Sequence, residues 1–254
     1  MRTLLERIAM PAEAWEDILS AKTGLNPEKE DELCARLCEP QGYDAAYGEL
    51  KELLKDDKDG FAMLQIMLRA AEISHRKYRE RGISEQVFTD TMGCFSRFVR
   101  EYKACFGHYG FDRGFWTGRQ LSLSLFRLGT LEFETNGAVH IPSDADLSES
   151  ALDEAFGLAR AFLPNVRFCC DSWLLSPVLG ELLPPTSRIN RFRERFEIQN
   201  ADEKNDGYKF WVFQNATLRP EDFPENTSLQ RAIKRHVLAG GNIGEAFGYL
   251  KDFK

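Results

Sequence analysis

The chain has 254 residues, of which 43% are hydrophobic and 29% are charged, and these proportions are ordinary for a folded protein. Its formal net charge is −7, so it lacks the positive field on which sequence-independent binding to nucleic acid depends. No apolar run approaches the roughly 18 residues that a membrane span needs, and the start of the chain lacks the apolar stretch of a signal peptide. These features favour a cytoplasmic protein with no nucleic-acid partner and no membrane span.

The 6 cysteines and 4 histidines show no metal-ligand spacing. Cys34 and Cys38 are one helical turn apart, and no pair of cysteines forms a CxxC motif. Because no secretory signal is visible, a disulfide framework is not expected. We interpret the cysteines as reduced thiols, buried or half-buried, and predict no metal site.

A helical pattern runs through residues 1–112, where apolar side chains recur every three or four positions. Ser84 is suited to cap one of these helices, with acidic and polar residues in the first turn after it. The glycine-rich segment 107–114 predicts a joint in the chain. We therefore expect a helical N-terminal domain at residues 1–112 and a second domain at residues 113–254, opened by one more helix at residues 115–127.

After residue 130 the predicted elements alternate between strands and helices. A strand at residues 131–135 turns at Asn136-Gly137, a dipeptide typical of tight hairpins, into a strand at residues 138–141. The other predicted elements are an acidic loop (142–147) that leads into an amphipathic helix ending near 163, strands at 166–171, 191–198 and 210–214, a short helix at 177–183, and a helical tail at 227–250 with a break at Gly240-Gly241. The expected fold class is α/β (α+β): an all-helical N-terminal domain followed by a mixed β-sheet domain flanked by helices.

His140 is the first candidate for chemistry. It stands between Val139 and Ile141 in a predicted strand, so its side chain should face opposite to these two apolar neighbours. The acidic segment 143–146 begins three residues later. A histidine beside carboxylates can hold a proton near neutral pH, as a general base must.

The acidic loop also has a purely structural interpretation. Asp144, Asp146 or Ser148 can cap the following helix, whose first two turns are acidic as the helix macrodipole favours. A capped loop at a strand end is equally a place where open α/β sheets bind ligands, so both interpretations stay open. Glu132 and Glu134 share one face of the preceding strand, and we interpret that face as solvated.

A second polar group follows the predicted strand at residues 166–171. Asp171 and Ser172 are suited to form a pocket wall, with Ser172 donating to a leaving thiolate and Asp171 orienting an amine. The alternative is a strand end with an Asx-type turn and a packed Trp173. Hydrolysis by Ser172, His140 and Asp171 is a further possibility, although the chain has no GxSxG nucleophile elbow.

Several segments resemble a bacterial family of GNAT-like acyltransferases with a helical N-terminal domain. The resemblance covers essentially the whole chain, and the order strand-strand-helix-strand-helix-strand-strand is that of the GNAT core from its fourth strand onward. The segments that carry it are RGFW at 113–116, RQLS at 119–122, LFRLG at 125–129, LEFE at 131–134, HIPSDADL at 140–147, SWLLSP at 172–177 and TSLQR at 227–231.

The resemblance implies N-acyl transfer from a thioester donor to a small-molecule amine. The donor would be acyl-CoA or an acyl carrier protein, acting as co-substrate, with no covalently bound cofactor. Acyl-CoA would lie where the parallel strands at residues 138–141 and 166–171 separate. Backbone groups of the first strand would hold pantetheine, and the pyrophosphate would sit at the start of the following helix.

The resemblance also assigns roles to individual residues. His140 or Asp144 is implied as the base or substrate anchor, and Asp171 and Ser172 as polar groups on the opposite wall. The implied cofactor-binding residues are Val139, Ile141, Ser143 and Trp173.

The loop at residues 142–148 departs from the GNAT pattern, which is glycine-rich and flanked by Arg or Gln. Here the loop holds two carboxylates and no glycine, so a phosphate would meet like charge. Three interpretations follow: the acyl group arrives on a carrier protein, basic residues such as Arg188, Arg191 or Arg193 supply the missing charge, or catalysis has been lost. In the last case the chain is a non-catalytic protein that binds a small ligand or has a regulatory role on a GNAT-like scaffold.

Overall fold

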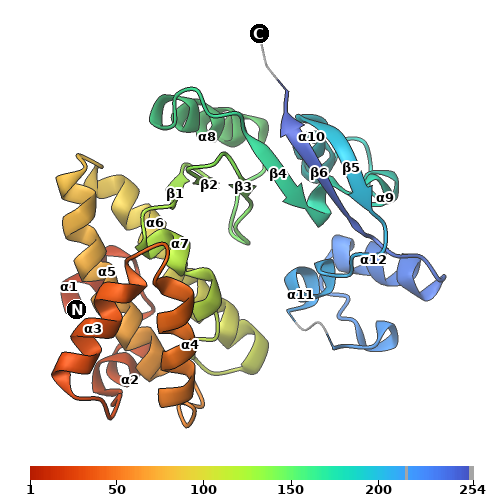
Figure 1. Ribbon diagram of the computed structural model, residues 1–254. Coiled ribbons are helices and arrows are strands. Elements are labelled where there is room, and N and C mark those ends of the chain that lie inside the picture. The colour runs from red at the N-terminus through yellow and green to blue at the C-terminus, as the bar shows by residue number, and fades with distance from the viewer. Residues whose placement is uncertain (215–216, 252–254) are drawn as a thin grey trace. The chain divides into compact units, whose positions relative to one another are not determined.

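The computed structural model describes residues 1–214 and 217–251 and divides into two compact units, Met1–Leu128 and Gly129–Lys254 (Figure 1). The predicted boundary at residue 112 therefore lies inside unit 1. There the amide of Phe111 donates a hydrogen bond of 2.7 Å to the carbonyl oxygen of Asp59, so the glycine-rich segment is packed. No helix formed by the described residues has the length and hydropathy that crossing a membrane requires.

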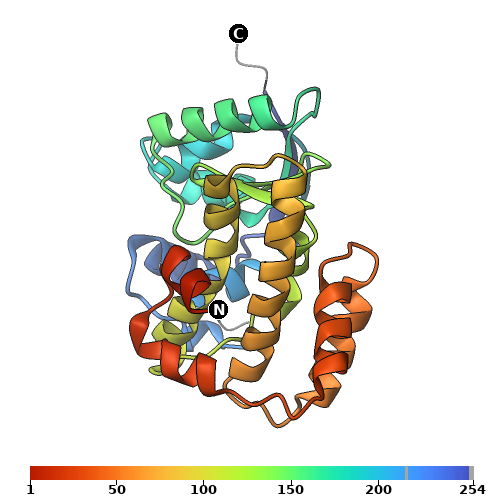
Figure 2. The ribbon, with the colours of Figure 1, turned by 90° about the vertical axis from the view of Figure 1, so that its left-hand side faces the viewer.

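Unit 1 is helical, as predicted, and ends in one strand. Its α-helices are α1 (Arg2–Arg7), α2 (Trp15–Ser20), α3 (Pro27–Leu37), α4 (Tyr43–Leu53), α5 (Phe61–Glu80), α6 (Glu85–Phe106) and α7 (Gly118–Leu121), and its strand is β1 (Leu125–Leu128). The two longest helices, α5 and α6, run side by side (Figure 2), and α5 also packs against α2 and α3. The apolar face of α5 is thus the centre of this unit's core.

Side-chain caps mark the starts of α3 and α6. The Asn26 side chain accepts a hydrogen bond from the amide of Lys29 at 2.8 Å, with proline at the first helical position. The predicted cap at Ser84 is confirmed, because its Oγ accepts from the amide of Val87.

The predicted helix at residues 115–127 is wrong. A 3-10 turn at Gly114–Trp116 leads into α7, which ends at Leu121, and the chain then enters β1. Leu123 has a φ of 60°, a left-handed conformation that a continuous helix cannot contain. The amide of Arg127 donates to Thr91 Oγ1 at 3.0 Å, so packing along α6 overrides the helical pattern.

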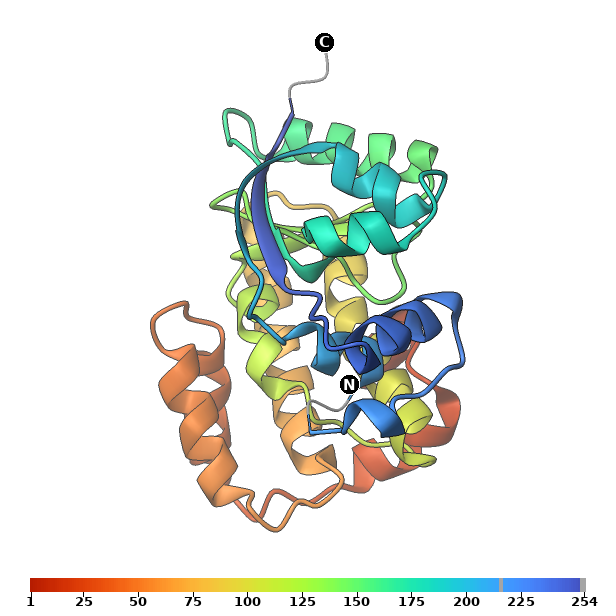
Figure 3. The same ribbon diagram turned by 90° about the vertical axis from the view of Figure 1, so that its right-hand side faces the viewer.

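Unit 2 contains two small sets of antiparallel strands and five α-helices within its described residues. The helices are α8 (Glu149–Phe162), α9 (Pro177–Leu182), α10 (Arg188–Glu194), α11 (Tyr208–Phe213) and α12 (Ser228–Leu238). The strands are β2 (Leu131–Glu134), β3 (Val139–His140), β4 (Cys169–Ser172), β5 (Phe196–Asp202) and β6 (Glu245–Leu250). β2 pairs with β3, and β6 lies between β4 and β5 (Figure 3).

Four phenylalanine rings join the elements of unit 2. Phe133 on β2 has edge contacts with Phe156 on α8 and with Phe168 before β4, with ring centroids 5.8 and 5.3 Å apart. Phe156 in turn contacts Phe196 at the start of β5. Each ring is nearly fully buried, so α8 is held against both groups of strands by the same apolar cluster.

Two predicted strands are partly or wholly helical. Residues 188–194 form α10, and only from Phe196 onward does the chain become a strand. Ser187 caps α10 through the amide of Asn190, whose side chain donates to three backbone carbonyls nearby. The aromatic run predicted as a strand at residues 210–214 is α11, in which Phe213 stacks on Phe223 at 4.0 Å.

The helix predicted at residues 227–250 is confirmed for its first part, which is α12, and wrong for its last part, which is the strand β6. The residues of β6 that face the core are Ala246, Gly248 and Leu250, so two of the three carry little or no apolar side chain. A Cβ at Gly248 would come within 2.9 Å of the backbone oxygen of Glu197 on the neighbouring strand. Close strand packing therefore selects small residues, and these hide the alternation by which a strand is recognised in the sequence.

The hairpin at Asn136-Gly137 is confirmed, and its glycine is a stability determinant. Gly137 has a φ of 98°, and a Cβ there would overlap the carbonyl oxygen of Arg167. Gly137→Ala should lower the free energy of unfolding by about 1–3 kcal/mol in chemical denaturation. Gly157→Ala, in the exposed middle of α8 with open space around it, should instead be neutral or raise it by up to about 1 kcal/mol. Equal effects of the two variants would contradict this explanation.

Candidate active site

β3 and β4 touch at one parallel bridge, between Ala138 and Cys169. The amide of Cys169 donates to the carbonyl oxygen of Gly137 at 2.9 Å. The bridge is isolated among the described residues, and the other edge of each strand pairs elsewhere, His140 with Glu132 on β2 and Cys170 with Gly248 on β6. Neighbouring parallel strands that separate were expected here, and their facing backbone groups can hydrogen-bond an extended ligand.

His140 lies beside a carboxylate on the hairpin. Its Nε2 is 2.7 Å from Glu134 Oε1, and the two side chains are 23% and 15% exposed. Val139 is buried, so the predicted opposition of the two side chains is confirmed. A carboxylate in this position fixes the orientation and tautomer of the imidazole, as the partner of a general-base histidine does.

The interpretation of the glutamates as a solvated face is wrong. Glu132 stands directly opposite His140 in the strand register and is only 2% exposed. Glu134 is also largely buried and is engaged with His140. The period of two in this strand was visible in the sequence, but the burial of its polar face was not.

The loop before α8 is ordered by Asp146. Its Oδ1 accepts from the amide of Ser148 and its Oδ2 from the hydroxyl of the same residue, both at 2.9 Å. These hydrogen bonds, and then the charge of Arg188, lower the pKa of Asp146. The amide of Asp146 donates to Thr130 Oγ1 at 2.6 Å. Ser143 and Asp144 are exposed on the same loop.

Arginines of α10 lie against the first turns of α8. Arg188 Nη1 is 3.1 Å from Asp146 Oδ1, and Arg191 Nη1 is 4.0 Å from Glu149 Oε2. Arg195, which sequence reasoning missed, donates to Asp153 at 2.6 Å and to a backbone oxygen of α8. Arg193 lies elsewhere, because its guanidinium covers Gly180 on α9. The start of α8 therefore has cations beside its carboxylates.

The end of β4 presents Asp171 to solvent, while Ser172 begins a 3-10 turn at Trp173–Leu175. Ser172 Oγ accepts from the amide of Leu174 at 3.2 Å, which leaves its O–H available to donate. The capped strand end is therefore made by a serine rather than by an Asx-type turn. Trp173 is half-buried.

Asp171 has a partner that sequence reasoning missed. Glu245, on the neighbouring strand β6, shares a hydrogen bond with it. Burial, this hydrogen bond and the charges of Asp171 and Asp202 raise the pKa of Glu245 to about 7. The local sequence predicts a helix at residue 245, so it gives no signal that would pair the two residues.

Cysteine chemistry is not supported at this position. Cys170 is fully buried, and burial raises the pKa of its thiol far above the ordinary value. The pKa of the half-buried Cys169 is raised for the same reason. Within residues 1–214 and 217–251 no group of His, Cys, Asp or Glu has the arrangement of a metal site.

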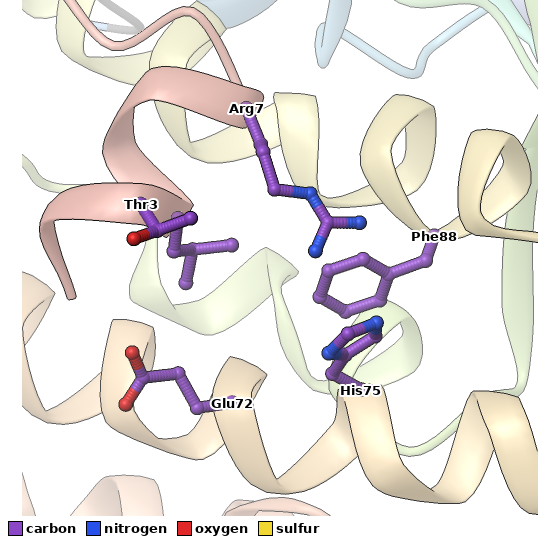
Figure 4. A pocket seen from close by; sticks show the side chains of 6 residues that line it. Thr3, Arg7, Glu72, His75 and Phe88 are labelled. Carbon is purple, nitrogen blue, oxygen red and sulfur yellow. The ribbon is translucent and has the colours of Figure 1, made fainter.

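A hollow of about 190 Å³ lies in unit 1 and was not anticipated from the sequence (Figure 4). Arg7 and His75 converge on the Phe88 ring, and the His75 and Phe88 ring centroids are 4.4 Å apart. His75 Nε2 is 2.8 Å from both carboxylate oxygens of Glu85, which also pairs with Arg7. Because these charged groups already pair with one another, the hollow serves as a junction of α1, α5 and α6.

The comparisons with known proteins agree with this architecture. A family model described as the N-acyltransferase N-terminal domain matches residues 1–123, and one described as the GNAT-like C-terminal domain matches residues 125–250. No curated protein matches the chain.

Solved acyltransferase structures share the fold. One in complex with decanoyl-CoA and teicoplanin has a TM-score of 0.81 and 23% identity, covering 98% of this chain and 87% of that one. A variant in complex with octanoyl-CoA has a TM-score of 0.80 with the same identity and coverage. Because the two family models together match residues 1–123 and 125–250, the chain belongs to the family of proteins that join an N-acyltransferase N-terminal domain to a GNAT-like C-terminal domain.

Proposed function

We propose that this protein transfers an acyl group from acyl-CoA to the nitrogen of an amine. The single observation that carries the proposal is the parallel contact of β3 and β4 at Ala138 and Cys169, after which the strands separate. Pantetheine carries amide groups that can pair with an open strand edge, here the backbone of Val139 and Ile141. The half-buried Trp173 then lines the opposite side.

The phosphates of CoA are proposed to bind at the start of α8. Backbone amides at a helix N-terminus favour an anion, and Ser143 adds a hydroxyl on the preceding loop. Arg188 and Arg191 supply the charge that the acidic loop lacks. Their present partners, Asp146 and Glu149, are exposed, and exposed ion pairs are weak enough for a phosphate to replace the carboxylate.

The neighbours guide the choice of donor and acceptor. The similar solved structures hold octanoyl-CoA, decanoyl-CoA, CoA and forms of teicoplanin. These complexes favour a medium-chain acyl-CoA over an acyl carrier protein as the donor for this chain. They also make a large amine-bearing acceptor such as teicoplanin the first one to test.

The proposed catalytic groups lie on both sides of the strand separation. His140, held by Glu134, takes a proton from the nitrogen as it attacks the thioester carbonyl. The Ser172 hydroxyl donates to the departing thiolate. Asp171 and the exposed Asp144 supply carboxylates that bind the cationic acceptor.

The function can be tested by following thiol release from decanoyl-CoA with teicoplanin, glucosamine or phenethylamine as acceptor. Acyl transfer predicts thiol release that requires both an amine and the thioester, with the acceptor gaining the mass of the acyl group. Binding of decanoyl-CoA without amine-dependent thiol release by any of the three would favour the non-catalytic interpretation.

The role of His140 can be tested separately. His140→Ala should lower kcat/KM by about 10²–10⁴-fold at neutral pH, because it removes the proton acceptor. Glu134→Gln keeps a hydrogen bond but removes the charge, so its loss should be smaller. His108→Ala changes an exposed histidine of unit 1 and serves as the matched control. An unchanged rate in folded His140→Ala would exclude this role.

A further inference from the structure

One face of the β4–β6–β5 sheet gathers carboxylates around an aromatic ring. Asp171 pairs with Phe247 in the strand register, and Asp202 pairs with Glu245. Directly opposite residues of antiparallel strands share a face, as do residues two apart on one strand. These four side chains therefore project from the same face, while Cys170 and its neighbours on the other face pack into the core.

This face begins where β3 and β4 separate. Asp171 lies two residues beyond the bridging Cys169, so it is the first side chain on that face of β4 after the bridge. Glu245 is its diagonal neighbour on β6, because Asp171 stands opposite Phe247. Diagonal neighbours with long side chains are within reach of each other, and these two share a hydrogen bond.

The groups around Glu245 all favour its holding a proton near neutral pH. Asp171 faces it from β4 and Asp202 from β5, and both are acidic. Gly207, just before α11, also lies close to this carboxyl, since a Cβ there would be 3.9 Å from Glu245 Oε2. Partial burial is the largest cause, and the hydrogen bond with Asp171 and the charges of Asp171 and Asp202 add to it, so the pKa of this carboxyl is raised to about 7.

We propose that Glu245, paired with Asp171, is the general base that converts the acceptor ammonium into the attacking amine. The proposal rests on the acyl-transfer function proposed above. The half-exposed Phe247 ring lies on the same face, and an aromatic ring beside carboxylates suits an ammonium ion.

The protons balance when Glu245 and His140 have separate tasks. Glu245 carboxylate takes one proton from R–NH3⁺, and the nitrogen lone pair of R–NH2 attacks the thioester carbonyl carbon. His140 then removes a second proton from nitrogen as the C–S bond breaks, and that proton passes to the thiolate sulfur. The products are an amide, CoA thiol and protonated Glu245, which releases its proton to water.

The test is the pH dependence of kcat/KM for decanoyl-CoA and phenethylamine between pH 5.5 and 9, in wild type and three variants. The wild-type rate should rise with pH through an apparent pKa near 7, because the base acts when deprotonated. In Glu245→Gln the rise of kcat/KM with pH should disappear, and kcat/KM should be at least about 100-fold lower at pH 8. In Asp171→Asn the rise of kcat/KM should move to lower pH, because the substitution removes a charge that raises the pKa of Glu245.

Glu197→Gln, on the same face of β5 but exposed and opposite Tyr249, should leave the profile unchanged. If the wild type releases thiol and Glu245→Gln has the same kcat/KM and the same pH dependence, the role of Glu245 is overturned while acyl transfer stands. If kcat/KM of Asp171→Asn rises at the same pH as that of the wild type, the pairing with Glu245 is overturned, even if Glu245→Gln does not fold. If the wild type releases no thiol with any amine, the proposed acyl transfer itself fails.

Discussion

The contact between Gly137 and Cys169 is the constraint on which the rest of unit 2 depends. One hydrogen bond of 2.9 Å brings the hairpin and β4 together in parallel, and the chain then sends them to different partners. Only a glycine permits this approach, because a side chain at residue 137 would overlap the backbone of Arg167. The phenylalanine cluster around Phe133 holds α8 against the same strands. The edges of β3 and β4 and the helix α8 are therefore positioned by one apolar core.

Electrostatics then divides the polar residues into two groups with different tasks. At the start of α8, Asp146 and Glu149 each have an arginine beside them, and these exposed pairs can exchange a carboxylate for a phosphate. On the open face of the β4–β6–β5 sheet, Asp171 and Asp202 stand beside the partly buried Glu245, so Glu245 keeps a proton near neutral pH. The first arrangement suits an anionic donor, and the second suits a cationic acceptor.

The sequence predicted the parts of this architecture that depend on local signals. Asn136-Gly137 predicted the hairpin, Ser84 predicted the start of α6, and alternation placed His140 opposite Val139. Sequence patterns failed where tertiary packing decides the outcome. The buried face of β6 carries small residues, and α11 is helical despite its aromatic run. Glu245 was missed for the same reason, since a carboxylate pair formed across strands leaves no trace in the local sequence.

The most direct test of the account is a thermal-shift titration with CoA and decanoyl-CoA, in wild type and in the Arg188→Gln/Arg191→Gln double variant. A ligand that binds only the native state raises the melting temperature with concentration. We expect a rise with both ligands, larger for decanoyl-CoA, and a weaker response to both in the double variant. No rise with either ligand would contradict the claim that the separating strands and the start of α8 bind acyl-CoA.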